Sequence, residues 1–263
     1  MDYTKDLNLV LELADLADSI SLPRFFAQDF LVENKPDATP VTEADRAVEK
    51  AIKDVQITRR PEDGIIGEEY GTSGDNLHGP GSRTWIIDPI DGTANFMRGV
   101  PVWATLIALA IDGKPVVSVV SAPAMGRRWW AAPGFGAQTK QIDGQVIDLA
   151  VSKIDNLADA SMSYVSLKLW DEIGQLDNLM NLVRKVWRTR AFGDFWSYML
   201  LAEGAIDMTC EHGLQIYDIA ALVPIVEQSG GRITDFVGEL TPESSHVIAS
   251  NGLLHEKVRA FFY

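Results

Sequence analysis

The chain has 263 residues, enough for one large domain or two closely packed halves with a sizeable buried core. Apolar residues make up 46% and charged residues 23%, close to the averages for globular proteins, which argues against a disordered or collagen-like chain. The formal net charge of -14 argues against a protein that neutralises nucleic-acid phosphates, and the single cysteine, Cys210, excludes an intrachain disulfide and a multi-cysteine zinc site.

The N-terminal segment gives no sign of export. Its first 21 residues hold six charged side chains and lack a basic stretch followed by an apolar run, which is the pattern of a signal peptide. No uncharged run approaches the roughly 20 residues that span a bilayer. With the single cysteine, these features predict a cytoplasmic protein without a membrane or nucleic-acid partner.

Hydrophobic periodicity predicts two helices at the start of the chain. Apolar residues recur at helical spacing over 6–21, and Pro23 should end or bend that helix. A second amphipathic helix should begin near Thr42, after a polar link over 33–39. Beyond Pro61, short apolar runs predict strands at 64–67 and 84–88, separated by a glycine-rich loop over 71–82.

The next predicted element is a hairpin, because β-rich segments at 102–111 and 116–121 flank the strong turn signal Asp112-Gly113. With further strands expected near 128–132 and 146–149, residues 1–150 should form an α+β half with a largely antiparallel sheet. From residue 161 strands and helices alternate, which favours a layered α/β half over 151–263. The strands expected there are 161–165, 187–190, 206–210, 232–235 and 246–249, and the helices are 170–184, 195–203, 219–228 and a last one from Leu253.

The most informative segment is the Asp-Pro-Ile-Asp-Gly-Thr run over 88–93. An apolar strand delivers Asp88 at its end, Pro89 stops the strand, and Asp91 returns three residues later. Carboxylates and a backbone carbonyl, here that of Ile90, are the oxygen ligands that hard cations such as Mg²⁺ prefer. The alternative is an Asp-Pro turn in which both carboxylates cap backbone amides.

Further acids bear on this choice. Glu68 and Glu69 also follow an apolar strand, and such an acidic cluster repels itself unless a cation or a proton compensates it. Glu68 is the better ligand, while Glu69 fits a solvated face. Asp218, before an apolar helical pattern, would alone be interpreted as a helix N-cap, and Asp45 follows Thr42 as in a capping box.

Together these segments resemble the three signatures of the inositol monophosphatase family of Mg²⁺-dependent phosphatases. The matching segments are Gly-Glu-Glu over 67–69, the run over 85–93, and Tyr217-Asp218 followed by an apolar helix and Gly-Gly at 230–231. They occur in the family's order over nearly the whole chain. The resemblance implies one catalytic unit over 1–263 with a layered α/β sandwich (αβαβα), in which the C-terminal half supplies Asp218 and the specificity pocket.

The resemblance also implies a role for each matching residue. The metal ligands that it implies are all oxygen donors: Glu68, Asp88, the Ile90 carbonyl, Asp91 and Asp218. They would hold roughly two or three Mg²⁺ ions, which Mn²⁺ could replace. The amides of Gly92 and Thr93 would bind the phosphate. Thr93 and Asp45 would act with Glu68 to activate a water that attacks phosphorus directly. Lys35 lies where the family has a basic residue near the metals, although a solvated lysine is the alternative.

The chain departs from the family pattern in two places. Many members have Trp where this chain has Tyr217, and inositol phosphatases have small residues where this chain has an aromatic stretch over 195–198. Both departures resemble the branch that hydrolyses histidinol phosphate, whose ammonium and imidazole a carboxylate could bind. The substrate-binding residues would then be Asp91, Asp194, Glu211 and Asp218. Helix capping is the alternative for Asp194, and core packing is the alternative for the aromatic stretch.

The sequence therefore predicts a Mg²⁺-dependent phosphomonoesterase that converts L-histidinol phosphate to L-histidinol in histidine biosynthesis. An inositol-1-phosphatase, or a related sugar or nucleotide phosphatase, is the alternative within the class. A non-catalytic metal-binding regulator is the alternative outside it, but metal binding alone would not need Thr93 and Asp45. The expected partner is a small phosphorylated metabolite. His212 could line its pocket, but a solvated loop histidine is the default interpretation. The resemblance implies a homodimer, to which the strand over 102–111 and Trp129-Trp130 could contribute.

Overall fold

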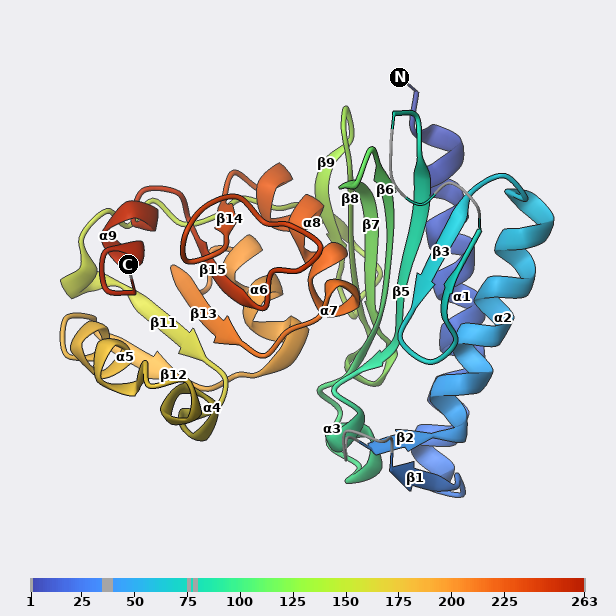
Figure 1. Cartoon of the computed structure of the whole chain (residues 1–263), viewed down its shortest axis with the longest axis horizontal. Helices are drawn as coiled ribbons and strands as arrows, with labels where there is room; N and C mark the ends of the chain where they lie inside the picture. Colours follow the sequence, from blue (N-terminus) through green and yellow to red (C-terminus); the bar gives the residue numbers. More distant parts are fainter. Residues whose placement is uncertain (1, 35–39, 75–76, 78–79, 263) are drawn as a thin grey trace.

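The computed structural model describes residues 2–34, 40–74, 77 and 80–262, which are arranged in five layers (Figure 1). Helices α1 and α2 cover one face of an eight-stranded sheet, and α6, α7 and α8 separate its other face from a five-stranded sheet. Helices α4, α5 and α9 lie on the outer side of that second sheet. This αβαβα order confirms the predicted fold class.

The N-terminal helices are α1 (Thr4–Ala27) and α2 (Glu43–Arg59), with the short pair β1 (Val32–Asn34) and β2 (Pro40–Thr42) between them. The sequence predicted only a polar link where this strand pair lies. The first helix was expected to end or bend at Pro23, and it does not end there, because α1 continues through this residue. Phe25 is buried there against Phe96 and Trp103, with ring centroids 5.6 and 5.4 Å apart, and this packing offsets the lost backbone hydrogen bond.

The eight-stranded sheet has the order β10-β9-β8-β7-β6-β5-β3-β4, and only β3 and β5 pair in parallel. The largely antiparallel sheet is therefore confirmed. At the predicted hairpin turn Asp112 and Gly113 both have positive φ, 52° and 78°, as a tight two-residue turn requires. The strands are β3 (Gly64–Gly67), β4 (Gly71–Ser73), β5 (Arg83–Asp91), β6 (Ala104–Ile111), β7 (Lys114–Ala122), β8 (Arg127–Ala132), β9 (Gly136–Lys140) and β10 (Val146–Asp148). The sequence did not predict β4 and β9.

The second sheet has the order β12-β11-β13-β15-β14 and mixes parallel with antiparallel pairs. Its strands are β11 (Ser161–Tyr164), β12 (Arg188–Arg190), β13 (Met208–His212), β14 (Arg232–Thr234) and β15 (His246–Ser250). The helices are α3 (Thr93–Met97), which follows β5, then α4 (Leu167–Glu172), α5 (Leu176–Val183), α6 (Asp194–Ala202), α7 (Ile216–Ala220), α8 (Leu222–Gln228) and α9 (His255–Arg259). Short 3₁₀ turns lie at Pro123–Met125 and Leu157–Asp159.

Two of the predicted helices are divided. The segment expected as one helix over 170–184 forms α4 and α5, which are separated at Gly174 with a φ of 67°. The helix expected from residue 219 begins at Ile216 and is divided at Ala221 into α7 and α8. As a result Asp218 lies inside the first turn of α7 and not at its N-cap.

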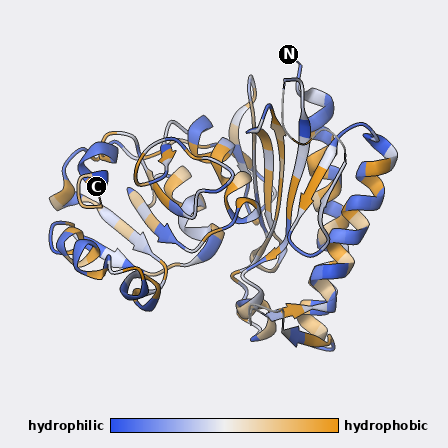
Figure 2. Cartoon of the chain, in the orientation of Figure 1, coloured by the Kyte–Doolittle hydropathy of each residue, from blue (hydrophilic) through white to orange (hydrophobic). Residues whose placement is uncertain are grey.

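Hydrophobic residues run along the strands of the large sheet, while α1 and α2 carry both hydrophobic and hydrophilic residues, orange and blue in Figure 2. One buried cluster joins β6, β7 and β8 to α6, α8 and β15, so the two halves share a core. Trp129 and Trp130 are 0% and 9% exposed within the single chain, so they are core residues, and the local reason for placing them at an interface is removed. None of the helices in the described ranges is long and apolar enough to cross a membrane.

Candidate active site

A β-bulge in strand β5 brings two of the predicted ligands to one side of the sheet. Asp88 pairs with Leu106 of β6 and Asp91 pairs with Ala104, so β5 carries an extra residue over this interval. In a regular strand, residues three apart point to opposite faces of the sheet. The extra residue of the bulge brings Asp88 and Asp91 to the same face. Asp88 is buried and its Oδ1 accepts the amide of Ile90 at 3.0 Å, which fixes the bend.

Asp218 reaches the same place from the other half of the chain. It is residue N3 of α7 and its Oδ2 accepts the Gln215 amide at 2.7 Å in a capping box. Carboxylate oxygens of Asp88, Asp91 and Asp218 all lie within 4.8 Å of one another, a separation that one cation can bridge. The turn interpretation for Asp88 is thus correct locally. The N-cap interpretation for Asp218 is wrong, because Gln215 is the N-cap and Asp218 is residue N3 of the capping box. Neither interpretation explains why the three carboxylates converge.

Glu68 joins this group because β3 and β5 are parallel, so their carboxyl ends meet at one edge. Its side chain is hydrogen-bonded to that of Asp88. The pKa of Asp88 is raised well above its usual range, first by burial and second by the nearby Glu68. The pKa of Asp91 is raised in the same way, first by burial and second by Asp194. Burial raises the pKa of Asp218 to about 7. In the described parts of the chain no lysine or arginine forms an ion pair with Asp88, Asp91 or Asp218.

The turn after β5 joins the acidic cluster to helix α2. Gly92 is the N-cap of α3 with a φ of 84°, and a side chain there would lie 3.0 Å from the Val102 carbonyl oxygen. The Thr93 hydroxyl lies 3.0 Å from the Ile90 carbonyl oxygen and 3.3 Å from Asp45 Oδ1. Asp45 also closes the predicted capping box with Thr42, and burial raises its pKa to about 6.

The sequence interpretation missed a residue that fixes Glu68 in place. Glu49 is 0% exposed, and its carboxylate accepts the amides of Glu69 and Tyr70 at 2.7 and 2.9 Å. A Cβ at Gly67 would overlap this carboxylate, so only glycine leaves room for it. Asp45 and Glu49, four residues apart on α2, present two acids on one buried helix face, and that spacing was the available signal.

Asp194 does not cap helix α6. Its φ is 48°, no side-chain cap bond forms at this helix end, and Asp91 Oδ2 accepts the Phe195 amide at 2.8 Å instead. The Asp194 carboxylate accepts a hydrogen bond of 3.0 Å from the side chain of Asn95, a residue that the sequence interpretation did not single out. The structure therefore places Asp194 at the edge of the acidic cluster, where burial raises its pKa.

A cavity of about 230 Å³ opens beside these carboxylates. Asp91, Asp194 and Asp218 line it together with Glu211 and His212 of β13. Glu211 is buried, accepts the Tyr198 hydroxyl at 2.9 Å, and has its pKa raised by burial to about 8. The remaining lining residues are Val165, Leu169, Phe195, Tyr198, Gly213, Leu214 and Leu222. A small molecule with a polar end at the acids and an apolar body fits this space.

His212, at the end of β13, lines the cavity, and its ring centroid lies 4.6 Å from that of His246. Burial, then His246, lowers its pKa. Of the aromatic stretch, Phe195 packs on Trp129 with ring centroids 6.1 Å apart, which supports the core-packing alternative for that ring. Lys35 falls outside the residues that the structure describes.

The model of the inositol monophosphatase family matches residues 6–262. This chain belongs to the inositol monophosphatase family. Members of the family are metal-dependent, and the convergent acids of this chain are a site of matching chemistry.

Individual relatives cover nearly the whole chain. A histidinol-phosphatase of Streptomyces coelicolor is 49% identical over 99% of this chain and 97% of its own, and one of Mycobacterium tuberculosis is 49% identical over 96% of both. Among solved structures, an inositol monophosphatase from Zymomonas mobilis is 34% identical with a TM-score of 0.84, covering 99% of this chain and 98% of its own. The extragenic suppressor protein suhB of Bartonella henselae is 28% identical with a TM-score of 0.86, over 98% of both chains.

Proposed function

We propose that this protein hydrolyses L-histidinol phosphate to L-histidinol and phosphate, as a Mg²⁺-dependent phosphomonoesterase. The observation that carries the substrate assignment is the 49% identity to two histidinol-phosphatases over nearly the full length of each chain. The wider assignment to a metal-dependent phosphatase has independent support in the family match and in the three converging aspartates.

The donor set fits a hard divalent cation. Glu68, Asp88, the Ile90 carbonyl, Asp91 and Asp218 offer only oxygen. Burial and the neighbouring carboxylates raise the pKa values of Asp88, Asp91 and Asp218, so their charged forms are disfavoured without a cation. In our proposal these residues hold Mg²⁺. The bound cation would lower the pKa of water, offset the phosphate charge and stabilise the leaving alkoxide.

The chain's own groups would orient the water and hold the phosphate. The Thr93 hydroxyl has a single proton, which it can donate to Asp45 Oδ1 or to the Ile90 carbonyl oxygen, and its lone pairs can accept a hydrogen bond from the attacking water. Asp45, with a pKa of about 6, can take a proton through Thr93 near neutral pH, with Glu68 as a second acceptor. The amides of Gly92 and Thr93, at the start of α3, would bind phosphate oxygens.

The substrate alcohol would occupy the cavity beside the carboxylates. Its ammonium would lie near Asp194 and Glu211, which both line that space. We also propose that residues 1–263 act as one catalytic unit, since the two halves share a core and Asp218 comes from the second half. The homodimer remains a proposal by resemblance. Sedimentation at micromolar concentration tests it, and a mass near 28.9 kDa would contradict it.

The decisive experiment is side-by-side turnover of L-histidinol phosphate, inositol 1-phosphate and fructose 1,6-bisphosphate with Mg²⁺. We expect the highest kcat/KM for histidinol phosphate, and preference for either other ester would overturn the substrate assignment. Asp91→Asn is the control, expected to be folded and inactive. Mg²⁺ binding without turnover of any ester would favour a non-catalytic regulator. Rapid-quench experiments with labelled substrate test direct attack, which a burst of labelled enzyme would refute.

A further inference from the structure

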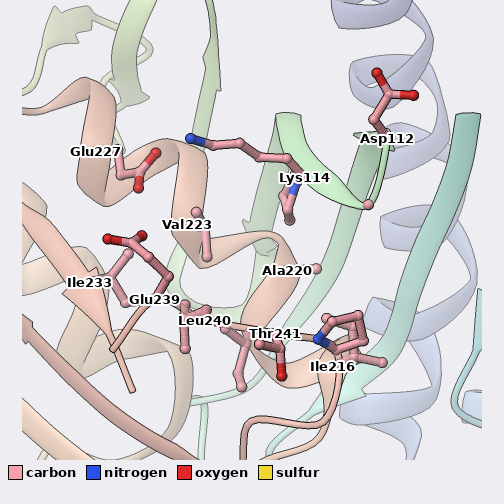
Figure 3. Close-up of a pocket in the computed structure, with 14 residues that line it drawn as sticks. Asp112, Lys114, Ile216, Ala220, Val223, Glu227, Ile233, Glu239, Leu240 and Thr241 are labelled. Carbon is pink, nitrogen blue, oxygen red and sulfur yellow. The ribbon is translucent and has the colours of Figure 1, made fainter. Parts of the chain in front are cut away.

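A second cavity, of about 480 Å³, lies away from the acidic cluster and shares no lining residue with the cavity described above. Its walls are the turn between β6 and β7, helices α7 and α8, and the segment over 239–242 that follows β14 (Figure 3). The volume is within the range of about 300–1,000 Å³ that small-molecule sites occupy. The proposed hydrolysis makes no use of this space.

The lining separates apolar from charged groups. Its apolar part comprises Ile216, Ile219, Ala220, Val223, Ile233 and Leu240. Four exposed charged side chains line it. Asp112 accepts the backbone amide of Gly81, and the other three are Lys114, Glu227 and Glu239. Figure 3 shows the Lys114 side chain extending across the cavity from the hairpin turn, with both glutamate carboxylates on the side of α8 and β14. None of the ion pairs found among the described residues uses these three groups.

We propose that this cavity binds a free α-amino acid with an apolar or aromatic side chain and that the bound molecule acts on the metal site through α7. An α-amino acid carries an ammonium and a carboxylate on one carbon, which complement the two glutamates and the lysine, respectively. Its side chain would cover the apolar part of the cavity and remove that surface from water. A ligand with only an ammonium would leave Lys114 without a partner, and a ligand with only a carboxylate would leave the two glutamates without one.

Helix α7 connects this cavity to the candidate active site. Ile216, Ile219 and Ala220 are spaced three and four residues apart and so share the helix face that lines the cavity. Asp218 belongs to the same five-residue helix and lies among the acids on its other side. Contact with one face of so short a helix can shift the carboxylate on the other. This coupling rests on the proposed role of Asp218 as a metal ligand.

Isothermal titration calorimetry on the metal-free protein tests binding without reference to turnover. L-leucine and L-phenylalanine should bind, whereas N-acetyl-L-phenylalanine amide, which lacks both charges, should bind at least about tenfold more weakly. Lys114→Met and the double variant Glu227→Gln/Glu239→Gln should each weaken binding by about three- to tenfold, as expected for exposed charged hydrogen bonds. Lys140→Met and Glu62→Gln change exposed residues outside the cavity and should leave binding unchanged.

Saturating Mg²⁺ in the same titration tests the coupling. Linkage requires that Mg²⁺ change the amino-acid Kd by the factor by which the amino acid changes the Mg²⁺ Kd, and we expect about fivefold. Absence of binding, equal binding of the capped amide, or binding unaffected by the charge variants would overturn the site. Equal Kd values with and without bound Mg²⁺ would overturn the coupling. Failure of Mg²⁺ to bind would count instead against the proposed function.

Discussion

Glu49 provides the sharpest test of how the chain holds Glu68. Its buried carboxylate accepts two backbone amides, those of Glu69 and Tyr70, directly after the proposed ligand. Glu49→Ala removes both acceptors and leaves two partly buried amides unpaired, at about 1–3 kcal/mol each. Because the truncated side chain also leaves a void and such terms are not additive, we expect a loss of about 2–5 kcal/mol in the free energy of unfolding.

Glu49→Gln separates the shape of this side chain from its two acceptors. The amide oxygen still accepts one backbone N–H, while the NH₂ group faces the other, so the expected loss is about 1–3 kcal/mol. Relief of the buried charge offsets part of it, because burial raises the pKa of Glu49. Loosening of the turn that carries Glu68 should raise the Mg²⁺ concentration for half-maximal activity by about tenfold.

The assays are urea unfolding without metal and activity as a function of Mg²⁺ concentration, on the same preparations. Asp54→Asn is the matched control, because this acid lies exposed on the same helix and its ion pair with Lys50 is worth less than about 1 kcal/mol. Gly67→Ala should reproduce Glu49→Ala, and the double variant should lose less than the sum of the two single losses, since both disturb one contact. If Glu49→Gln matched the wild type in unfolding and in Mg²⁺ dependence, Glu49 would not position Glu68.

Three other predictions concern charge. Asp194→Asn should lower kcat/KM for histidinol phosphate by roughly one to two decades, which corresponds to about 1.5–3 kcal/mol of lost transition-state stabilisation, and should change hydrolysis of glycerol phosphate much less. Equal losses with both esters would reject an ammonium contact. The pKa of Glu211 is raised from 4.5 to about 8, so its neutral form stabilises the fold below pH 4.5. That contribution to the free energy of unfolding, about 3–5 kcal/mol, is lost as pH rises through 8. Metal-free Glu211→Gln should show a flatter dependence of stability on pH over this range, and an unchanged slope would contradict the assignment. His255 is buried between Thr234 and Ser250, and its pKa is lowered from 6.5 to about 4. The contribution of neutral His255 to stability is therefore fully present above pH 6.5 and is lost as pH falls through 4. His255→Gln should weaken this acid sensitivity in thermal melts, and an equally steep pH profile would count against the role of His255.

Local chemistry allowed much of the fold to be predicted from the sequence. Asp112-Gly113 fixes a tight hairpin because both residues tolerate positive φ, and Thr42 with Asp45 closes a capping box within one helical turn. The motif over 88–93 also identified the acids of β5, although β5 continues through Pro89 to Asp91, where the sequence predicted that the strand would stop. Where contacts are local, the residue types decide the geometry.

Only the tertiary structure decided which groups meet. Asp218 looks like a helix cap until α7 packs beside β5, and Asp194 looks like a cap until Asn95, 99 residues earlier in the chain, takes its carboxylate. Distant packing also carries α1 through Pro23, and it brings Glu49 against Gly67. These outcomes depend on burial between segments far apart in the sequence, and the free energy of such packing exceeds the local preference that a single residue expresses.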